Sequence, residues 1–230
     1  MADNDTLQTI KTEDKEGIYG KWRPDVALDS VFNLFSLNKL LQMEVARTGT
    51  TVFKIKHEVR NREHMVSDIV TSLLLWYNAP KSKSPQFTNA LVHEELLMFV
   101  WLLADLERSG HLITNYYSKK EKLPFVTEEA DPGRWDIVLT FEHNLKAISR
   151  IFLEGGQRPG RVVNGWRTTG LYRRDAFNSF MRHLFDYLAD PKGFVSDATS
   201  PTLHVEALLS NAWIIADLEA RDNFKPEDRK

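Results

Sequence analysis

The sequence repeats itself at an offset of 111 residues, and this repeat constrains the fold more than any other feature of the chain. Residues 61–98 align with residues 172–209 without a gap. One extra residue in the second copy then brings residues 101–107 onto 213–219, and a fainter match extends both copies towards the N-terminus. Identical residues at equivalent positions include Arg62/Arg173, Leu73/Leu184, His93/His204 and Glu95/Glu206. Because an internal repeat indicates a repeated structural unit, we interpret the chain as a tandem duplication.

Apolar residues recur at helical spacing in three segments of each copy, which predicts an all-α fold made of a duplicated three-helix unit. The expected helices are residues 29–42, 61–77, 88–108, 141–154, 172–189 and 201–220. The third helix is apolar on all sides over residues 96–104, so we expect it to be buried against the other half or another subunit. Residues 50–59 are rich in β-branched side chains and allow a short extended segment.

The two copies differ in their polar residues, and the differences place a candidate site in the second copy. Arg182-His183 aligns with Thr71-Ser72, and Asp197 aligns with Gln86. We therefore expect five regions along the chain. They are a disordered tail (1–18), a first repeat with a structural role (20–107), a linker (108–132), a second repeat with the site (133–220) and a charged tail (221–230).

Composition argues against several classes of function. The net charge of −2 provides no general attraction for nucleic-acid polymers or anionic membranes. The absence of cysteine excludes disulfides and thiolate metal sites. The longest strongly apolar run has nine residues, against the roughly 20 that a membrane-spanning helix needs. The polar N-terminal segment does not resemble a secretory signal, so the sequence predicts a cytoplasmic protein.

A loop rich in arginine and glycine, over residues 155–167, has no equivalent in the first copy. Arginine side chains and closely approaching backbone N–H groups suit a polyphosphate ligand. We therefore expect Arg158, Arg161 and Arg167 to bind phosphate, and Trp166 to stack on a base. The alternative is a surface loop without a ligand, since the phosphate-binding pattern G-x-x-x-x-G-K-[ST] is absent.

Helical geometry sorts the remaining polar residues. In the last helix, His204 and Asn211 are seven residues apart and share one stripe, whereas Glu206 and Asp217 are expected to face solvent. The alternative for His204 and Asn211 is a buried pair bonded to a neighbouring helix. In the preceding helix one polar stripe contains Asp175, Ser179, Arg182 and Asp186, with His183 at its border. This stripe is also compatible with a salt-bridged surface, because Arg182 and Asp186 are four residues apart.

The second copy resembles a phage-encoded family, the dATP/dGTP diphosphohydrolases, which are MazG-like all-α nucleoside triphosphate pyrophosphohydrolases. The resemblance lies in the order and spacing of several short motifs. They are Gly133-Arg134-Trp135-Asp136, Gly155, Asn164-Gly165-Trp166-Arg167, Asp175 with Arg182-His183, Asp197 with His204, and Asn211. The Glu-Glu-x-x-Glu helix of the wider MazG group is absent, and Ala207 stands where the family often has a second histidine.

This resemblance implies Mg²⁺-dependent hydrolysis of a (deoxy)nucleoside triphosphate, with a purine base, to the monophosphate and pyrophosphate. Asp175 and Asp197 would hold the metal, and His183, His204 and Asp197 would be catalytic. The substrate-binding residues would be Arg158, Arg161, Trp166, Arg167, Arg182 and Asn211. The expected partner is a nucleotide or deoxynucleotide, with neither a nucleic-acid polymer nor a membrane, and a homo-oligomer through the third helices is possible. A phage-encoded protein would act in the host cytoplasm. The alternatives are a nucleotide-binding phage protein without turnover and a helical scaffold protein.

Overall fold

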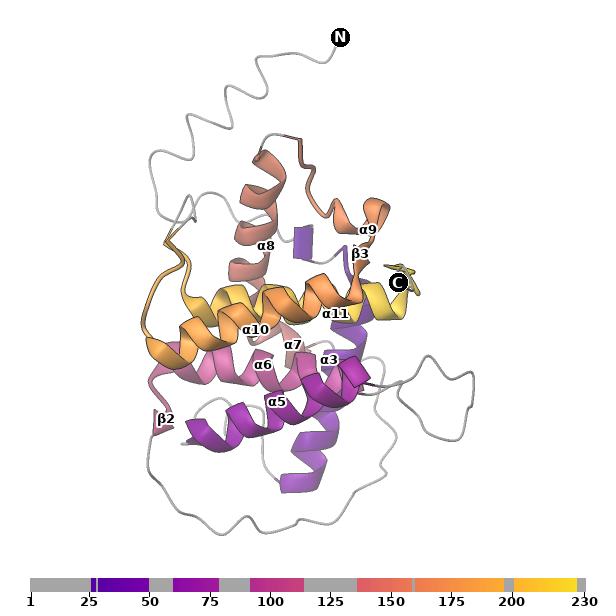
Figure 1. The fold of residues 1–230 in the computed structure, drawn as a ribbon. Helices are drawn as coiled ribbons and strands as arrows, with labels where there is room; N and C mark the ends of the chain where they lie inside the picture. Colours follow the sequence, from indigo (N-terminus) through magenta and orange to yellow (C-terminus); the bar gives the residue numbers. More distant parts are fainter. Residues whose placement is uncertain are drawn as a thin grey trace.

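The computed structural model describes residues 26–27, 29–49, 60–78, 92–113, 136–158, 160–196 and 201–226. These residues confirm the predicted all-α fold, with strands of only two residues each (Figure 1). The elements of the first half are α3 (Val31–Thr48), β1 (Arg60–Asn61), α5 (Arg62–Asn78), α6 (Val92–Ser109) and β2 (Leu112–Ile113). Those of the second half are α7 (Asp136–Leu139), α8 (Glu142–Gln157), α9 (Trp166–Thr169), β3 (Leu171–Tyr172), α10 (Arg173–Ala189), α11 (His204–Ala220) and β4 (Phe224–Lys225). None of the described helices is long and apolar enough to cross a membrane.

Several predictions concern residues that the structure does not describe. These are the N-terminal tail (1–18), the extended segment (50–59), most of the linker (108–132) and the candidate ligand Asp197.

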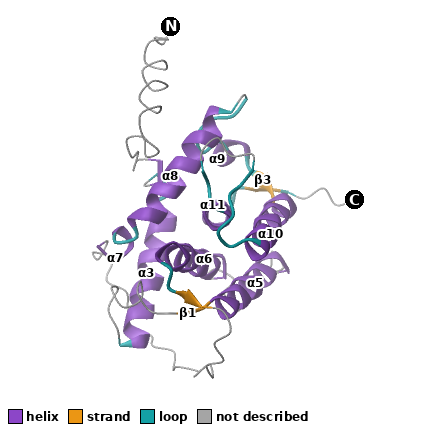
Figure 2. Cartoon of the chain, turned by 90° about the vertical axis from the view of Figure 1, so that its left-hand side faces the viewer, coloured by secondary structure: helices purple, strands orange, loops and turns teal. Residues whose placement is uncertain are grey.

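The described elements of the two halves match in order and pairing. Strand β1 pairs in parallel with β2, and β3 pairs in parallel with β4 in the equivalent register. Helices α6 and α11 lie at the centre (Figure 2). Helices α5 and α10 cover one side of them, and α3 and α8 cross the other side. The chain therefore forms one bundle in which each half contributes three long helices, and the described elements of the second half also include the short helices α7 and α9.

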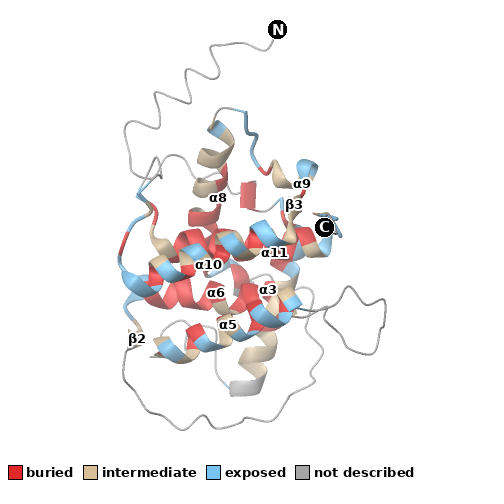
Figure 3. Cartoon of the chain, viewed as in Figure 1, coloured by how far each residue is buried: buried red, intermediate tan, exposed pale blue. Residues whose placement is uncertain are grey.

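The packing of α6 against α11 explains why α6 is apolar on all sides in its middle and why α11 is buried over most of its length. The rings of Trp101 and Trp213 stack across this contact with 6.0 Å between their centroids, and both side chains are fully buried. Buried residues concentrate along both helices (Figure 3). The sequence left two packing partners open for α6, the other half of the chain or another subunit. In the structure α6 packs on α11 of the other half. The described residues in the middle of both helices are buried or half-buried by this packing.

Asparagine side chains attach the crossing helices to this centre in the same way in both halves. The Nδ2 group of Asn33 in α3 donates to the carbonyl of Trp213 over 2.8 Å. The Nδ2 group of Asn144 in α8 donates to the carbonyl of Trp101 over the same distance. Both asparagines are buried.

Two glutamates near the C-terminal ends of α6 and α11 join the halves, but less symmetrically. Glu107 accepts two hydrogen bonds of 3.0 Å from Arg62 and one of 2.7 Å from the hydroxyl of Tyr187, and it pairs with Lys192 over 2.9 Å. The equivalent Glu219 accepts a 2.7 Å hydrogen bond from the indole of Trp76 and lies 3.3 Å from Arg173. Glu107 thus connects the first half to α10, and Glu219 connects the second half to α5.

The environment of Glu107 shifts two pKa values, that of its own carboxyl and that of the Tyr187 hydroxyl. Burial alone would raise the pKa of the Glu107 carboxyl. Hydrogen bonds from Lys192 and Tyr187, together with the charges of Arg62 and Lys192, outweigh burial and lower that pKa below its usual value. The pKa of Tyr187 is strongly raised, first by burial and then by its contact with the Glu107 carboxylate.

Three predictions about the second half are wrong. Helix α11 begins at His204 rather than near Pro201, because Phe194 and Leu203 form a β-bridge and the N–H of Val195 donates to the carbonyl of Thr202 over 2.8 Å. Part of the expected C-terminal tail forms β4, which pairs with β3. Glu206 and Asp217 are also buried rather than solvent-facing.

The two buried acids of α11 are neutralised by arginines from neighbouring elements. Asp217 pairs with Arg167 over 2.8 Å and with Arg221 over 3.2 Å. Glu206 pairs with Arg108 and with Arg150. These contacts arise because α11 packs against α3, α6, α8, α9 and α10, so that both carboxylates lie between helices.

Candidate functional site

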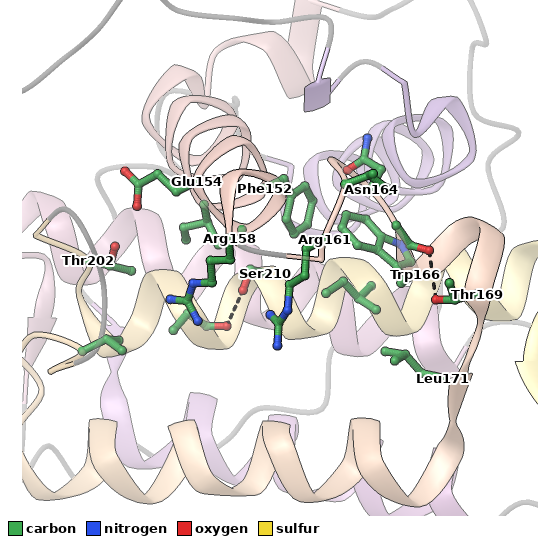
Figure 4. A pocket seen from close by; sticks show the side chains of 18 of the residues that line it. Phe152, Glu154, Arg158, Arg161, Asn164, Trp166, Thr169, Leu171, Thr202 and Ser210 are labelled. Carbon is green, nitrogen blue, oxygen red and sulfur yellow. Dashed lines mark hydrogen bonds between the residues drawn. The ribbon is translucent and has the colours of Figure 1, made fainter. Parts of the chain in front are cut away.

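A cavity of about 530 Å³ lies in the second half, between the C-terminal part of α8, the loop that follows it, α9, α10 and α11 (Figure 4). Its base includes Ala207, Ser210 and Ile214, which lie on one side of α11. At 1.5 Å per residue these three span about 10 Å along the helix. The cavity therefore has the size typical of a site for a small organic ligand.

The loop between α8 and α9 is folded tightly against the end of α8. A Cβ atom at Gly156 would lie only 2.4 Å from the backbone nitrogen of Val163, so glycine is required for this approach. Asn164 takes a left-handed conformation (φ 56°) and its Nδ2 group donates to Asp29 over 3.2 Å. As a result Arg158 and Arg161 lie side by side on the wall of the cavity (Figure 4).

An aromatic group lies at the α9 side of the cavity. Trp166 packs on Phe152 of α8 with ring centroids 4.3 Å apart, and Leu171 lies nearby. The indole Nε1 of Trp166 and the side-chain Oδ1 of Asn164 are buried and have no hydrogen-bond partner among the described residues. A buried donor and a buried acceptor on the lining of one cavity are suited to the polar edge of a ligand.

Arg182 and His183 of α10 also line the cavity, as the sequence analysis expects of a site in the second half. The guanidinium of Arg182 lies 3.4 Å from Nε2 of His183. His204, at the first position of α11, lies close to His183. Arg158, Arg161, Trp166, Arg182 and His183 thus line one cavity, whereas His204 is not on its lining and lies beside His183.

Three of the expected site residues lie elsewhere. Arg167 is 11% exposed and pairs with the fully buried Asp217 and with Asp29, so it anchors α9 rather than lining the cavity. Asn211 is half-buried and donates over 2.9 Å to the backbone carbonyl of Ala207 in its own helix, rather than lining the cavity or forming the expected bond to a neighbouring helix. Asp175 is exposed beside Arg174 and lies about 12 Å along α10 from His183.

The charge of the cavity is positive. Arg158, Arg161 and Arg182 line it together with a single carboxylate, Glu154. Magnesium prefers oxygen ligands and is held in proteins by carboxylates. The described residues of the cavity do not provide such a set, because Asp175 is remote and the one lining carboxylate lies among arginines. The described lining residues alone therefore do not form a carboxylate set for the Mg²⁺ ion that the family resemblance implies, and the expected ligand Asp197 lies outside the described residues.

Sequence reasoning did not identify Phe152, Ser210 or the proximity of Asp186 to the two histidines. One signal was present in the repeat, since Ala207 aligns with the fully buried Leu96 of the first half. A small residue in place of leucine leaves room beside α11. The contact of Asp186 with His204 depends on how α10 packs on α11, which no local pattern shows.

No family model, curated protein or solved structure is significantly similar to this chain.

Proposed function

We propose that the protein binds a (deoxy)nucleoside triphosphate with a purine base in this cavity and hydrolyses it to the monophosphate and pyrophosphate. The observation that carries the proposal is the combination of an aromatic wall and three arginines around one cavity. A nucleotide has the matching composition, with a flat aromatic base at one end and a chain of negative phosphates at the other.

Trp166 would contact the base in this arrangement. Its ring already packs on Phe152, and its buried N–H group lacks an acceptor that a base nitrogen or carbonyl can provide. The unpaired Oδ1 of Asn164 would accept from an exocyclic amino group. Purines offer both kinds of group on their edges.

The arginines would contact the phosphates. Arg158 and Arg161 approach from the loop and Arg182 from α10, so they enclose the phosphate chain from different elements. Charge-assisted hydrogen bonds from guanidinium groups are about twice as strong as neutral ones. His183 and His204 lie next to Arg182, where they would orient water or phosphate.

One observation favours nucleotide binding without turnover as the second candidate. Glu154 is the only carboxylate on the lining of the cavity among the described residues. Few acidic groups are thus present to activate a water molecule directly. A protein that sequesters a nucleotide would need only the aromatic wall and the arginines.

A panel of deoxynucleoside triphosphates, tested with Mg²⁺, Mn²⁺ and Zn²⁺ in turn, separates these candidates. Thermal unfolding reports binding, and release of pyrophosphate reports turnover. Hydrolysis of a purine nucleotide to monophosphate and pyrophosphate would support the proposal, whereas a raised melting temperature without pyrophosphate would support sequestration. If no nucleotide raises the melting temperature, both candidates are wrong.

A further inference from the structure

We propose that His183, Asp186 and His204 form a binding site for a divalent transition-metal ion of the Zn²⁺, Co²⁺ or Mn²⁺ class. The three side chains come from two helices and meet where α10 packs against the start of α11. One ligand atom from each lies within 4.8 Å of the other two. This metal site is independent of the nucleotide proposal, because it is tested without nucleotide.

The geometry needs only small movements to bind an ion. The Nδ1 atom of His183 lies 4.0 Å from Oδ2 of Asp186, one turn further along α10. Ligand atoms at about 2.0–2.2 Å from a common ion lie roughly 3–4 Å from one another. Side-chain rotations that move each ligand atom by about 1 Å would therefore bring the three atoms to these distances without moving either helix.

The backbone around His204 holds its ring in place. The N–H of His204 donates to the carbonyl of Gly193 over 3.0 Å. A Cβ atom at Gly193 would lie 2.7 Å from the carboxylate of Asp190 and 2.9 Å from Cδ2 of the imidazole, so the loop packs directly on the ring. The Nδ1 atom of His204 is buried and has no hydrogen-bond partner among the described residues. A buried ring nitrogen without a partner costs free energy unless a ligand satisfies it.

The types of ligand select the metal. Two imidazoles and one carboxylate suit zinc and the neighbouring transition metals, whereas magnesium and calcium prefer oxygen ligands. Three protein ligands also leave coordination positions open for water or phosphate oxygens. Because His183 also lines the cavity, these positions would be close to the phosphate-binding arginines.

Metal binding at Nδ1 of His183 would also change the contact of this ring with Arg182. A ring that binds metal through Nδ1 carries its proton on Nε2, and Nε2 then no longer accepts a hydrogen bond from the guanidinium 3.4 Å away. Arg182 is exposed and can turn towards the cavity.

The first half provides a matched control. The positions equivalent to His183, Asp186 and His204 are Ser72, Leu75 and His93, so only one of the three ligands is present there. A metal site that depends on the trio should be insensitive to His93→Ala.

The test is calorimetric titration of the metal-free full chain with Zn²⁺, and with Co²⁺ while the visible absorption of the ion is recorded. We expect one ion per chain, retention of Zn²⁺ in excess Mg²⁺, and a Co²⁺ spectrum with nitrogen ligands. His183→Ala, Asp186→Asn and His204→Ala should each weaken binding by at least about 100-fold, because loss of an outer-shell partner alone costs 10–100-fold.

Circular dichroism establishes that each variant is folded, and Asp186→Asn is the variant with the smallest change of shape. The proposal is overturned if the folded wild type binds no Zn²⁺, if Mg²⁺ displaces Zn²⁺ at equal concentration, or if Asp186→Asn and His204→Ala bind as the wild type does. A loss of binding in His93→Ala as large as that in His204→Ala would also overturn it.

Discussion

The two halves of this chain share their framework and differ in their polar chemistry. The strand pairs, the asparagine contacts and the central tryptophans occur in both halves. Arginine, histidine and aspartate in α10 stand where α5 has threonine, serine and leucine. The comparison shows that a duplicated frame needs only its buried contacts in both copies, so the second copy can carry a cavity without loss of the fold.

The difference also has a structural side. Ala207 of α11 is equivalent to Leu96 of α6, and the smaller residue lines the cavity. The loop between α8 and α9 then closes the cavity, with Gly156 allowing its close approach to Val163. A few residue differences between the halves, together with one loop, therefore account for the candidate site. The packing of α6 on α11 does not depend on them.

The largest expected effect concerns the two glutamates that join the halves. Glu107→Ala should lower the free energy of unfolding by about 3–5 kcal/mol, because it leaves Arg62 without its buried partner. Glu219→Ala should cost about 1–2 kcal/mol, mainly by removing the acceptor of the Trp76 indole. Urea unfolding followed by circular dichroism measures both. Equal costs would show that the greater number of contacts at Glu107 does not make it the stronger connection.

The second prediction contrasts equivalent positions on α10 and α5. Arg182→Ala should weaken binding of a nucleoside triphosphate by about 10–100-fold, because a hydrogen bond to a charged group contributes about 1.5–3 kcal/mol. Thr71→Ala, at the equivalent exposed position of α5, should leave binding unchanged. Fluorescence or calorimetric titration gives both affinities. Similar losses in the two variants would contradict a site confined to the second half.

The helices could be predicted from the sequence because apolar periodicity is a local property. The same reasoning was wrong about Glu206 and Asp217, since a helical wheel identifies one buried side and α11 packs against helices on several sides. Arg167 belongs to the arginine-rich loop, yet its partner Asp217 is 50 residues away. Charged residues in a loop therefore indicate a phosphate site only after their internal partners are known.

The candidate site was predictable where the two copies could be compared with each other. Arg182 and His183 were identified because the first half has other residues there, and both line the cavity. For Asp186 the sequence left both a site residue and a salt-bridged surface open, because its distance to His204 depends on the packing of α10 against α11. Comparison of repeats thus finds residues that differ, and only the tertiary structure shows which of them meet.

The third prediction concerns stability in acid. The pKa of Glu107 is lower in the folded state than in the unfolded state, so its stabilising effect is complete above the unfolded value of about 4.3. As the pH falls through the folded pKa, the unfolded state takes up its proton first and this stability is lost. Urea unfolding between pH 3 and 6 should therefore show a slope that Glu107→Gln reduces, by at most about 1.4 kcal/mol per pH unit.

Glu95 provides the opposite control in the same range of pH. Burial, with the neighbouring charge of Glu94, raises the pKa of Glu95, so its unfavourable contribution appears as the pH rises through the folded value. Glu95→Gln should make the acid slope steeper, whereas Glu107→Gln makes it shallower. Slopes that change in the same direction would contradict the assigned causes.

The smallest effect tests whether equivalent contacts have equivalent energies. Asn33 and Asn144 are 1% and 3% exposed, and each donates over 2.8 Å to the carbonyl of a central tryptophan. Asn33→Ala and Asn144→Ala should each cost about 1 kcal/mol in urea unfolding, because each removes one buried hydrogen bond to a helix backbone. If Asn144→Ala costs much more than Asn33→Ala, the half with the cavity depends more on its crossing helix. Equal costs would mean that the frame is energetically the same on both sides, and that the arginines and histidines of the second half were added without changing how α3 and α8 are held.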